Sequence, residues 1–139
     1  MIQPDRLTVK AAEALQQAAS LARSKGNPVI NDAHLFYALL QQEEGIVVPL
    51  LQKAGLNITQ LQAEAEREIE RFPKQSGGAD PTISRELSRV LDRADEEAKS
   101  LGDAYVSTEH VLLALVEVKN TTIASGMRIT PIVLNWRFR

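Results

Sequence analysis

The sequence predicts an all-α protein: a compact helical module of two similar halves, the second of them incomplete. Three observations predict this fold class. Residues 24–39 and residues 100–115 carry nearly the same sequence, SKGNPVINDAHLFYAL and SLGDAYVSTEHVLLAL. Apolar residues in both copies recur at helical spacing. A short stretch rich in proline and glycine, residues 73–82, separates the copies and is predicted to be a linker.

The internal repeat keeps one offset without gaps. His110 lies 76 positions after His34, and the same offset pairs identical or similar residues over roughly thirty positions. A constant offset over such a length indicates a duplication, in which each copy is one structural unit. The identical pairs include Leu15 with Leu91, Ala18 with Ala94, Ala22 with Ala98, Ser24 with Ser100, Gly26 with Gly102, Ala38 with Ala114 and Leu39 with Leu115.

The first helix of each copy has a recognisable beginning and end. Thr8 and Ser84 are suitable N-caps, because a hydroxyl oxygen can accept a hydrogen bond from a free backbone N–H of the first turn. Gly26 and Gly102 stand where a residue in the left-handed conformation commonly ends a helix. The inner face of the first helix is predicted to consist of Ala11, Leu15, Ala18 and Ala22, and its alanines permit close packing of another helix.

The second helix of each copy is predicted to be buried. Asn31 or Asp32 caps the first of them, and Ser107 or Thr108 caps the other. The stretches HLFYALL and HVLLALV that follow are apolar on nearly all sides, which is typical of a helix inside the core.

The first copy continues with two further helices. A short one has Pro49 in its first turn and Gly55 at its end. A longer amphipathic helix runs from about Ile58 to Phe72. Its inner face is predicted to consist of three apolar residues, Leu61, Ala65 and Ile69.

The second copy does not repeat these two helices. After Val118 nothing matches the first copy, and residues 126–139 show no helical period and favour an extended chain. We therefore divide the chain into a first repeat at 1–72, the linker at 73–82, an incomplete second repeat at 83–125 and a non-matching tail at 126–139. An incomplete second repeat would leave part of its apolar face uncovered.

Composition excludes several classes of protein. The 139 residues have a net charge of −2, no cysteine and 44% apolar residues. The absence of cysteine excludes disulfides and thiolate chemistry and fits a reducing cytosol, where we place the protein. No apolar run reaches the roughly 18 residues of a membrane span, and the N-terminus lacks an apolar signal core, so we expect no secretory signal. The charge is too balanced for nucleic-acid binding, so we expect neither membrane nor nucleic acid as a partner.

The sequence offers no catalytic motif. Phosphate-binding loops, dinucleotide-binding loops and paired metal-ligand spacings are absent, so we expect no enzyme activity, no cofactor and no metal. The repeat itself explains His34 and His110 as histidines that pack and hydrogen bond at a helix start, in preference to metal ligands. Arg85, Arg89 and Arg93 form a basic stripe, but the acidic residues around it favour a solvated, ion-paired face.

The duplicated pattern resembles the Clp repeat of the N-terminal domains of the ClpB family and its relatives ClpA and ClpC. The stretches LTVKAAEALQQAASLA, HLFYALLQQEEGIVVPLLQKAGLN and GDAYVSTEHVLLAL carry the resemblance, which covers about residues 5–119. It implies two four-helix repeats on a pseudo-twofold axis, joined in the parent protein to two AAA+ rings that hydrolyse ATP. It also implies binding of unfolded or aggregated protein segments, with an adaptor as a further partner.

The resemblance implies three substrate-binding residues: Thr8, Asp103 and Glu109. Each also has a local structural explanation. Thr8 suits an N-cap, Asp103 suits a turn, and Glu109 suits the first turn of a helix, where the dipole favours negative charge. Two alternatives stay open, namely an adaptor- or phosphoarginine-binding domain of the ClpC or ClpA kind and a truncated fragment without function. The first copy has Ala33 where Glu109 stands in the second, so at most one copy could bind a phosphoarginine guanidinium through a carboxylate.

Overall fold

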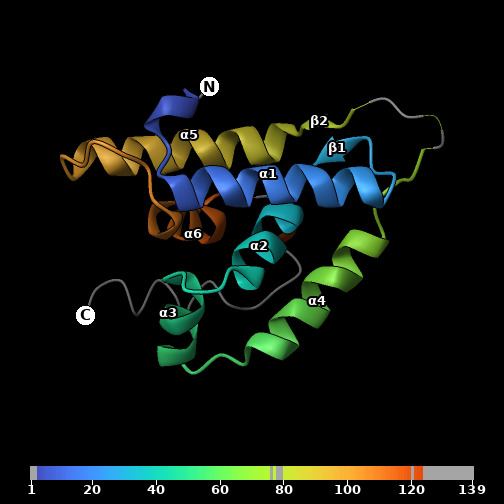
Figure 1. Ribbon diagram of the computed structural model, residues 1–139, viewed down its shortest axis with the longest axis horizontal. Helices are drawn as coiled ribbons and strands as arrows, with labels where there is room; N and C mark the ends of the chain where they lie inside the picture. Colours follow the sequence, from blue (N-terminus) through green and yellow to red (C-terminus); the bar gives the residue numbers. More distant parts are fainter. Residues whose placement is uncertain (1–2, 76, 78–79, 120, 124–139) are drawn as a thin grey trace.

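The computed structural model describes residues 3–75, 77, 80–119 and 121–123 (Figure 1). Helices dominate this part of the chain, with a short 3-10 helix, η1, at its start. The elements are η1 (Pro4–Arg6), α1 (Val9–Ser24), β1 (Val29–Ile30), α2 (Asp32–Gln41), α3 (Val47–Lys53), α4 (Ile58–Glu70), β2 (Thr82–Ile83), α5 (Arg85–Ser100) and α6 (Thr108–Glu117). The predicted all-α fold class is confirmed, apart from the two short strands.

Local capping explains where the first helix of each repeat begins. The Thr8 hydroxyl accepts a hydrogen bond from the Ala11 backbone N–H at 3.2 Å, and the Ser84 hydroxyl accepts one from Leu87 at 3.0 Å. These bonds satisfy donors that have no partner within the helix. Both predicted N-caps are therefore confirmed.

The ends of α1 and α5 also match. Gly26 and Gly102 follow the two helices with φ of +72° and +75°. L residues with a Cβ rarely adopt this conformation, so glycine suits both turns. The equal geometry supports the predicted duplication.

Helices α2 and α6 form the centre of the core. Asn31 and Ser107 are their N-caps, which decides both alternatives left open by the sequence. Helix α2 contacts α1, α3, α4, α5 and α6, and in Figure 1 it lies between α1 above and the α3–α4 pair below. The apolar residues of both helices are almost completely buried, among them Leu35, Phe36, Leu39, Leu112 and Leu115.

The long helix of the first repeat is slightly shorter than predicted. Leu61, Ala65 and Ile69 form its buried face, as expected. Helix α4 nevertheless ends at Glu70, two residues before the predicted end at Phe72. The chain turns there, and the ring of Phe72 packs against His34.

Two short parallel strands, which no sequence pattern predicts, join the two repeats. Val29 pairs with Thr82 and Ile30 pairs with Ile83. An isolated parallel bridge pairs Leu7 with Val106. By the offset of 76, Leu7 corresponds to Ile83 and Val106 corresponds to Ile30, so this bridge is the equivalent of the second pair with the two repeats interchanged. In both cases the residue before the first helix of one repeat pairs with a residue before the second helix of the other repeat. These pairs connect the two halves around the pseudo-twofold axis.

The correspondence between the repeats extends at least to residue 123. Asp32, fully buried at the start of α2, accepts hydrogen bonds from the backbone N–H groups of Thr122 at 3.2 Å and Ile123 at 2.8 Å. Ile123 is fully buried and equivalent by the offset to Val47, which begins α3. Burial raises the pKa of Asp32, while the two backbone bonds act in the opposite direction. The tail predicted at 126–139 lies outside the described residues, and the division of the chain into four segments stays a prediction.

Candidate functional site

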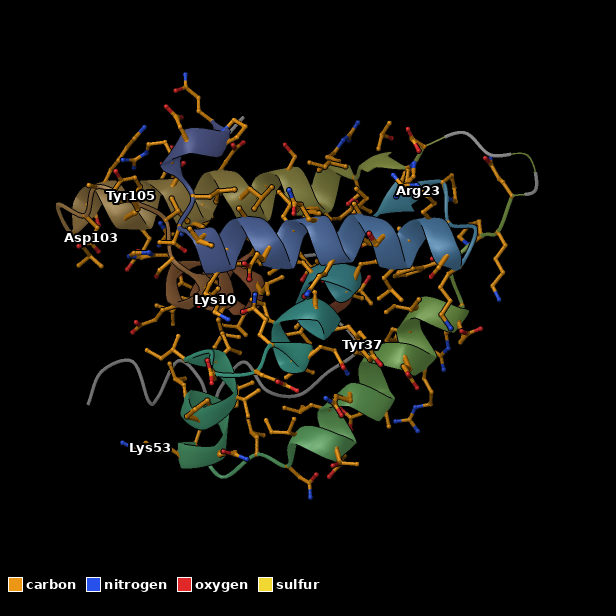
Figure 2. All side chains as sticks on the ribbon, in the orientation of Figure 1. Lys10, Arg23, Tyr37, Lys53, Asp103 and Tyr105 are labelled. Atoms are coloured by element: carbon orange, nitrogen blue, oxygen red, sulfur yellow. The ribbon has the colours of Figure 1, made fainter. Side chains whose placement is uncertain are left out.

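An open hollow of about 430 Å³ lies between the α5–α6 loop and the first turns of α6. Figure 2 shows two of its residues, Asp103 and Tyr105, at the end of the molecule where α5 finishes. The hollow combines carboxylates, a histidine and apolar side chains. Its lining consists of Leu101, Asp103, Ala104, Tyr105, Ser107, Glu109, His110 and Leu113.

His110 orients the Asp103 carboxylate. The backbone N–H of Ser107 donates to Nδ1 of His110 at 2.9 Å, so the ring proton of the neutral imidazole lies on Nε2. Nε2–H then donates to Oδ2 of Asp103 at 2.9 Å. The Asp103 side chain is 49% exposed, and its Oδ1 has no hydrogen-bond donor among the described residues. One carboxylate oxygen is thus held while the other faces solvent.

Glu109 supplies a second carboxylate to the same hollow. It stands in the first turn of α6, is half-buried and lines the hollow with Asp103. The helix dipole stabilises a negative charge at this end of a helix. Within the described part of the chain no cation pairs with Glu109, so its charge remains available to a ligand.

Two exposed apolar side chains border these carboxylates. Leu101 is 62% exposed and Tyr105 is 57% exposed, and both line the hollow. Large apolar residues exposed together at a concave surface often mark a binding site. No local pattern in the sequence singles out either residue. Comparison of the two repeats could have identified them, because the equivalent residues differ in type. Tyr105 corresponds to Val29, a strand residue, and Leu101 corresponds to Lys25.

The three residues implied by the resemblance are not all brought together. Asp103 and Glu109 share the hollow, whereas Thr8 does not line it. Thr8 is nevertheless adjacent, because its backbone N–H donates to the carbonyl oxygen of Val106 at 3.0 Å. Its hydroxyl accepts the capping bond described above. Roles of all three in binding stay predictions.

Arg6 fixes the loop that forms one wall of the hollow. Its guanidinium donates to Asp95 Oδ1 at 2.8 Å and to the carbonyl oxygen of Ala104 at 2.5 Å. The hydrogen bond from Arg6 holds the pKa of Asp95 below its usual value. The segment before α1 therefore positions the α5–α6 loop.

Both ring nitrogens of each histidine are hydrogen bonded. The described residues contain no group of three or more histidine, cysteine or acidic side chains that could hold a metal ion. His34 Nδ1 accepts from the Asn31 N–H at 2.8 Å, and its Nε2 bonds Asn27 Oδ1 at 2.9 Å. Both histidines are thus packed and hydrogen bonded at a helix start, as predicted.

The basic stripe of α5 is ion-paired at Arg93. Its guanidinium lies 3.2 Å from Glu97 and 2.9 Å from Glu117. At this position the predicted ion-paired face is confirmed. No helix among the described residues is long and apolar enough to cross a membrane.

Comparison with known proteins identifies the class to which this fold and hollow belong. The sequence pattern of the Clp repeat (R) N-terminal domain matches residues 6–128. The chain therefore belongs to the Clp repeat N-terminal domain family.

Its curated relatives include ClpB chaperones. The chain is 39% identical over 117 residues to the chaperone protein ClpB of Bacteroides thetaiotaomicron, a match that covers 84% of this chain and 14% of that protein. It is 42% identical over 112 residues to ClpB 1 of Synechococcus elongatus, covering 80% of this chain and 13% of that protein. The chain thus spans about one seventh of the length of these relatives, and the expected resemblance to ClpB is confirmed.

Solved N-terminal domains share the fold. The N-terminal domain of ClpV1 ATPase from E. coli superposes with a TM-score of 0.79 at 25% identity, covering 94% of this chain and 78% of that one. The Hsp104 N-terminal domain from Candida albicans gives 0.77 at 22% identity, with 94% and 91% coverage. A ClpV N-domain in complex with a VipB peptide gives 0.76 at 22% identity, with 97% and 86% coverage.

Proposed function

We propose that this chain is the substrate-engaging module of a ClpB-type AAA+ disaggregase and binds exposed segments of unfolded or aggregated protein. The observation that carries the proposal is the hollow at α6, where the carboxylates of Asp103 and Glu109 stand beside the exposed side chains of Leu101 and Tyr105. Unfolded segments present apolar side chains together with free backbone N–H groups and basic side chains. The hollow offers a complement to each of these groups.

The chemistry of the hollow predicts weak binding. A flexible segment loses conformational entropy when it becomes ordered, which offsets much of the contact energy. Weak capture suits a module that passes a client on and does not retain it. In this proposal Asp103 and Glu109 bind client donors directly, and Thr8 borders the contact beside Val106.

ATP hydrolysis belongs to other parts of the parent protein in this proposal. The family pattern that matches this chain is that of an N-terminal domain, and the matched relatives are about seven times longer. The chain itself then acts as a binding module without enzymatic activity, in the cytoplasm, with the AAA+ rings as its covalent partners. Relatives of the ClpV type support peptide binding by this fold, since one of them is in complex with a VipB peptide.

A second candidate ligand is a phosphoarginine side chain or an adaptor that presents one. The observation in its favour is that Glu109 lines the hollow and forms no ion pair with a described residue. The equivalent position in the first repeat is Ala33, which is fully buried and offers no acceptor. Such a ligand would thus occupy one repeat only, which favours the ClpB-type function over a two-site adaptor domain.

Capture of a denatured model protein tests the proposal. The double variant Asp103→Ala with Glu109→Ala should lose most of the capture while keeping its helical circular dichroism. The matched control is Glu13→Ala with Glu43→Ala, which removes the same charge from exposed positions away from the hollow. Equal capture by both variants would contradict the proposal and leave the two acids as turn and helix-start residues.

A further inference from the structure

The backbone pairings that join the two repeats differ at one position. By the offset of 76, Thr82 corresponds to Arg6, and Pro28 corresponds to Ala104. The Pro28 carbonyl oxygen accepts the backbone N–H of Thr82 at 3.2 Å. The backbone N–H of Arg6 donates instead to the Gln3 carbonyl oxygen at 2.9 Å, within the turn of η1. The Ala104 carbonyl oxygen therefore lacks the backbone donor that its equivalent has.

The guanidinium of Arg6 supplies the missing donor. Nη1 donates to the Ala104 carbonyl oxygen at 2.5 Å, and no other described group donates to that oxygen. Nε and Nη2 both donate to Oδ1 of Asp95 on α5, at 3.1 Å and 2.8 Å. A side chain held by α5 thus replaces a backbone bond at the α5–α6 loop.

This double contact requires an arginine. A guanidinium presents its donors as a rigid planar fork, whereas a lysine has one ammonium nitrogen on a flexible stem. The side chains of Arg6 and Asp95 are 26% and 19% exposed, so the pair is partly shielded from solvent and is screened less by salt than a surface pair. Arg6 therefore holds the loop in one defined geometry.

Tyr105 lies between two residues that Arg6 binds. The guanidinium holds the carbonyl of Ala104, and the carbonyl oxygen of Arg6 accepts the backbone N–H of Val106 at 2.7 Å. Tyr105 lines the hollow with an exposed side chain, whereas Arg6 does not line it. Because both neighbours of Tyr105 are fixed, Arg6 determines how Tyr105 presents its ring.

We infer that Arg6 is a positioning residue of the hollow. Fixed by Asp95, its guanidinium holds the Ala104 carbonyl and keeps Tyr105 in the arrangement that receives a bound segment, while Arg6 itself does not touch that segment. A loop that is ordered before binding loses less conformational entropy on binding, which strengthens capture. This inference rests on the proposed function and adds to it a residue outside the hollow.

Capture of fluorescein-labelled lysozyme, unfolded by reduction and alkylation, tests the inference by fluorescence anisotropy. Arg6→Ala should raise the Kd roughly fivefold, the factor expected when one more side chain must be ordered on binding. Arg6→Lys should also weaken capture, since it keeps the charge but cannot bond Asp95 and Ala104 together. The matched control is Arg23→Ala, which removes an arginine paired with Asp80 in the first repeat and should leave the Kd unchanged.

Asp95→Ala distinguishes positioning from a direct effect of charge. Arg6→Ala removes a positive charge and Asp95→Ala removes a negative one, so direct electrostatic effects on the client would have opposite signs. Positioning predicts weaker capture in both, because each change frees the Ala104 carbonyl, and no further loss when the two are combined. Opposite effects of the two variants would overturn the inference.

A double-mutant cycle tests whether Arg6 acts through Tyr105. In the Tyr105→Ala background, Arg6→Ala should change the Kd by less than about twofold, since the ring that it positions is absent. Hydrogen exchange should be faster at Tyr105 and Val106 in Arg6→Ala and unchanged in α1 and α5, which separates release of the loop from loss of the fold. A full effect of Arg6→Ala without the Tyr105 ring would contradict the inferred role.

The outcomes separate this inference from the proposed function. Capture that depends on Asp103 and Glu109 but is equal in Arg6→Ala and the wild type would overturn the inference and leave the proposed function standing. Absence of capture by the wild type would remove both. If Arg6→Ala reduces the helical circular dichroism, Arg6→Lys decides, and capture by Arg6→Lys at the level of the wild type would overturn the inference.

Discussion

Acid should destabilise this protein through one buried histidine, His34. Its side chain is fully buried, and its Nδ1 accepts the backbone N–H of Asn31. Burial lowers the pKa of His34 from 6.5 to about 4. A group whose pKa is lower in the folded state contributes stability that is present above pH 6.5 and is lost as the pH falls towards 4.

The size of the effect follows from the shift in pKa. A shift of one unit corresponds to 1.36 kcal/mol, so the full loss of unfolding free energy is about 3 kcal/mol below pH 4. At pH 5 the same linkage gives a loss of about 2 kcal/mol. With a urea dependence of about 2 kcal/mol per molar, the unfolding midpoint should fall by about 1 M between pH 7 and pH 5.

Urea unfolding of the wild type and of His34→Gln, at half-unit steps from pH 7.5 to pH 5, measures this loss. The variant should be less stable at pH 7, because a buried packing and capping group is changed, but its stability should fall less on acidification. His110→Gln is the matched control, since it changes the equivalent histidine and retains His34. Parallel pH curves for the wild type and His34→Gln would refute the reasoning.

Three further predictions concern individual residues. Asp32→Ala should lower the unfolding free energy by about 1–3 kcal/mol, because one buried and one half-buried backbone N–H group lose their acceptor, and thermal unfolding measures it. Gly102→Ala should cost about 1 kcal/mol for its φ alone. Gly26→Ala should cost more, since its Cβ would lie 3.2 Å from the Gln75 carbonyl oxygen; equal urea midpoints for the two would contradict this. Calorimetric titration with phosphoarginine should show at most one weak site per chain, at Glu109, and two equivalent sites would contradict the ClpB-type function.

Elements defined by local chemistry could be predicted from the sequence. The N-caps of α1 and α5, Thr8 and Ser84, each bond a backbone N–H three residues away, so the signal and its effect lie in one turn. The internal repeat strengthens the prediction of these caps, because a cap recognised in one copy supports the equivalent cap in the other. The turns at Gly26 and Gly102 were predictable for the same reason.

Features made by distant partners could not be predicted. Strands of two residues have no measurable period, and the pairing of Ile30 with Ile83 joins the end of one loop to the end of another. The role of Asp32 depends on backbone N–H groups 90 and 91 positions away. The sequence indicated only a helix start there, since an aspartate near an N-terminus already has a local explanation.

The candidate site was predicted in its charges but not in its shape. Asp103 and Glu109 were taken from the resemblance, and their common hollow follows from one loop and one helical turn. The exposure of Leu101 and Tyr105 depends on whether a segment covers them, which a local pattern does not contain. The offset of the repeat held the missing information, because the equivalent of each lining residue can be examined for a partner.

The two histidines show how a duplicated unit can present different hydrogen-bonding groups without a new fold. In both repeats a backbone N–H fixes the imidazole tautomer, and Nε2–H orients the residue seven positions earlier. In the first repeat that residue is Asn27, which donates to Pro73 and closes the site with the chain's own turn. In the second it is Asp103, which cannot donate to a carbonyl. The amide-to-carboxylate difference therefore leaves this position able only to accept hydrogen bonds, while the imidazole and the helix start that hold it stay the same.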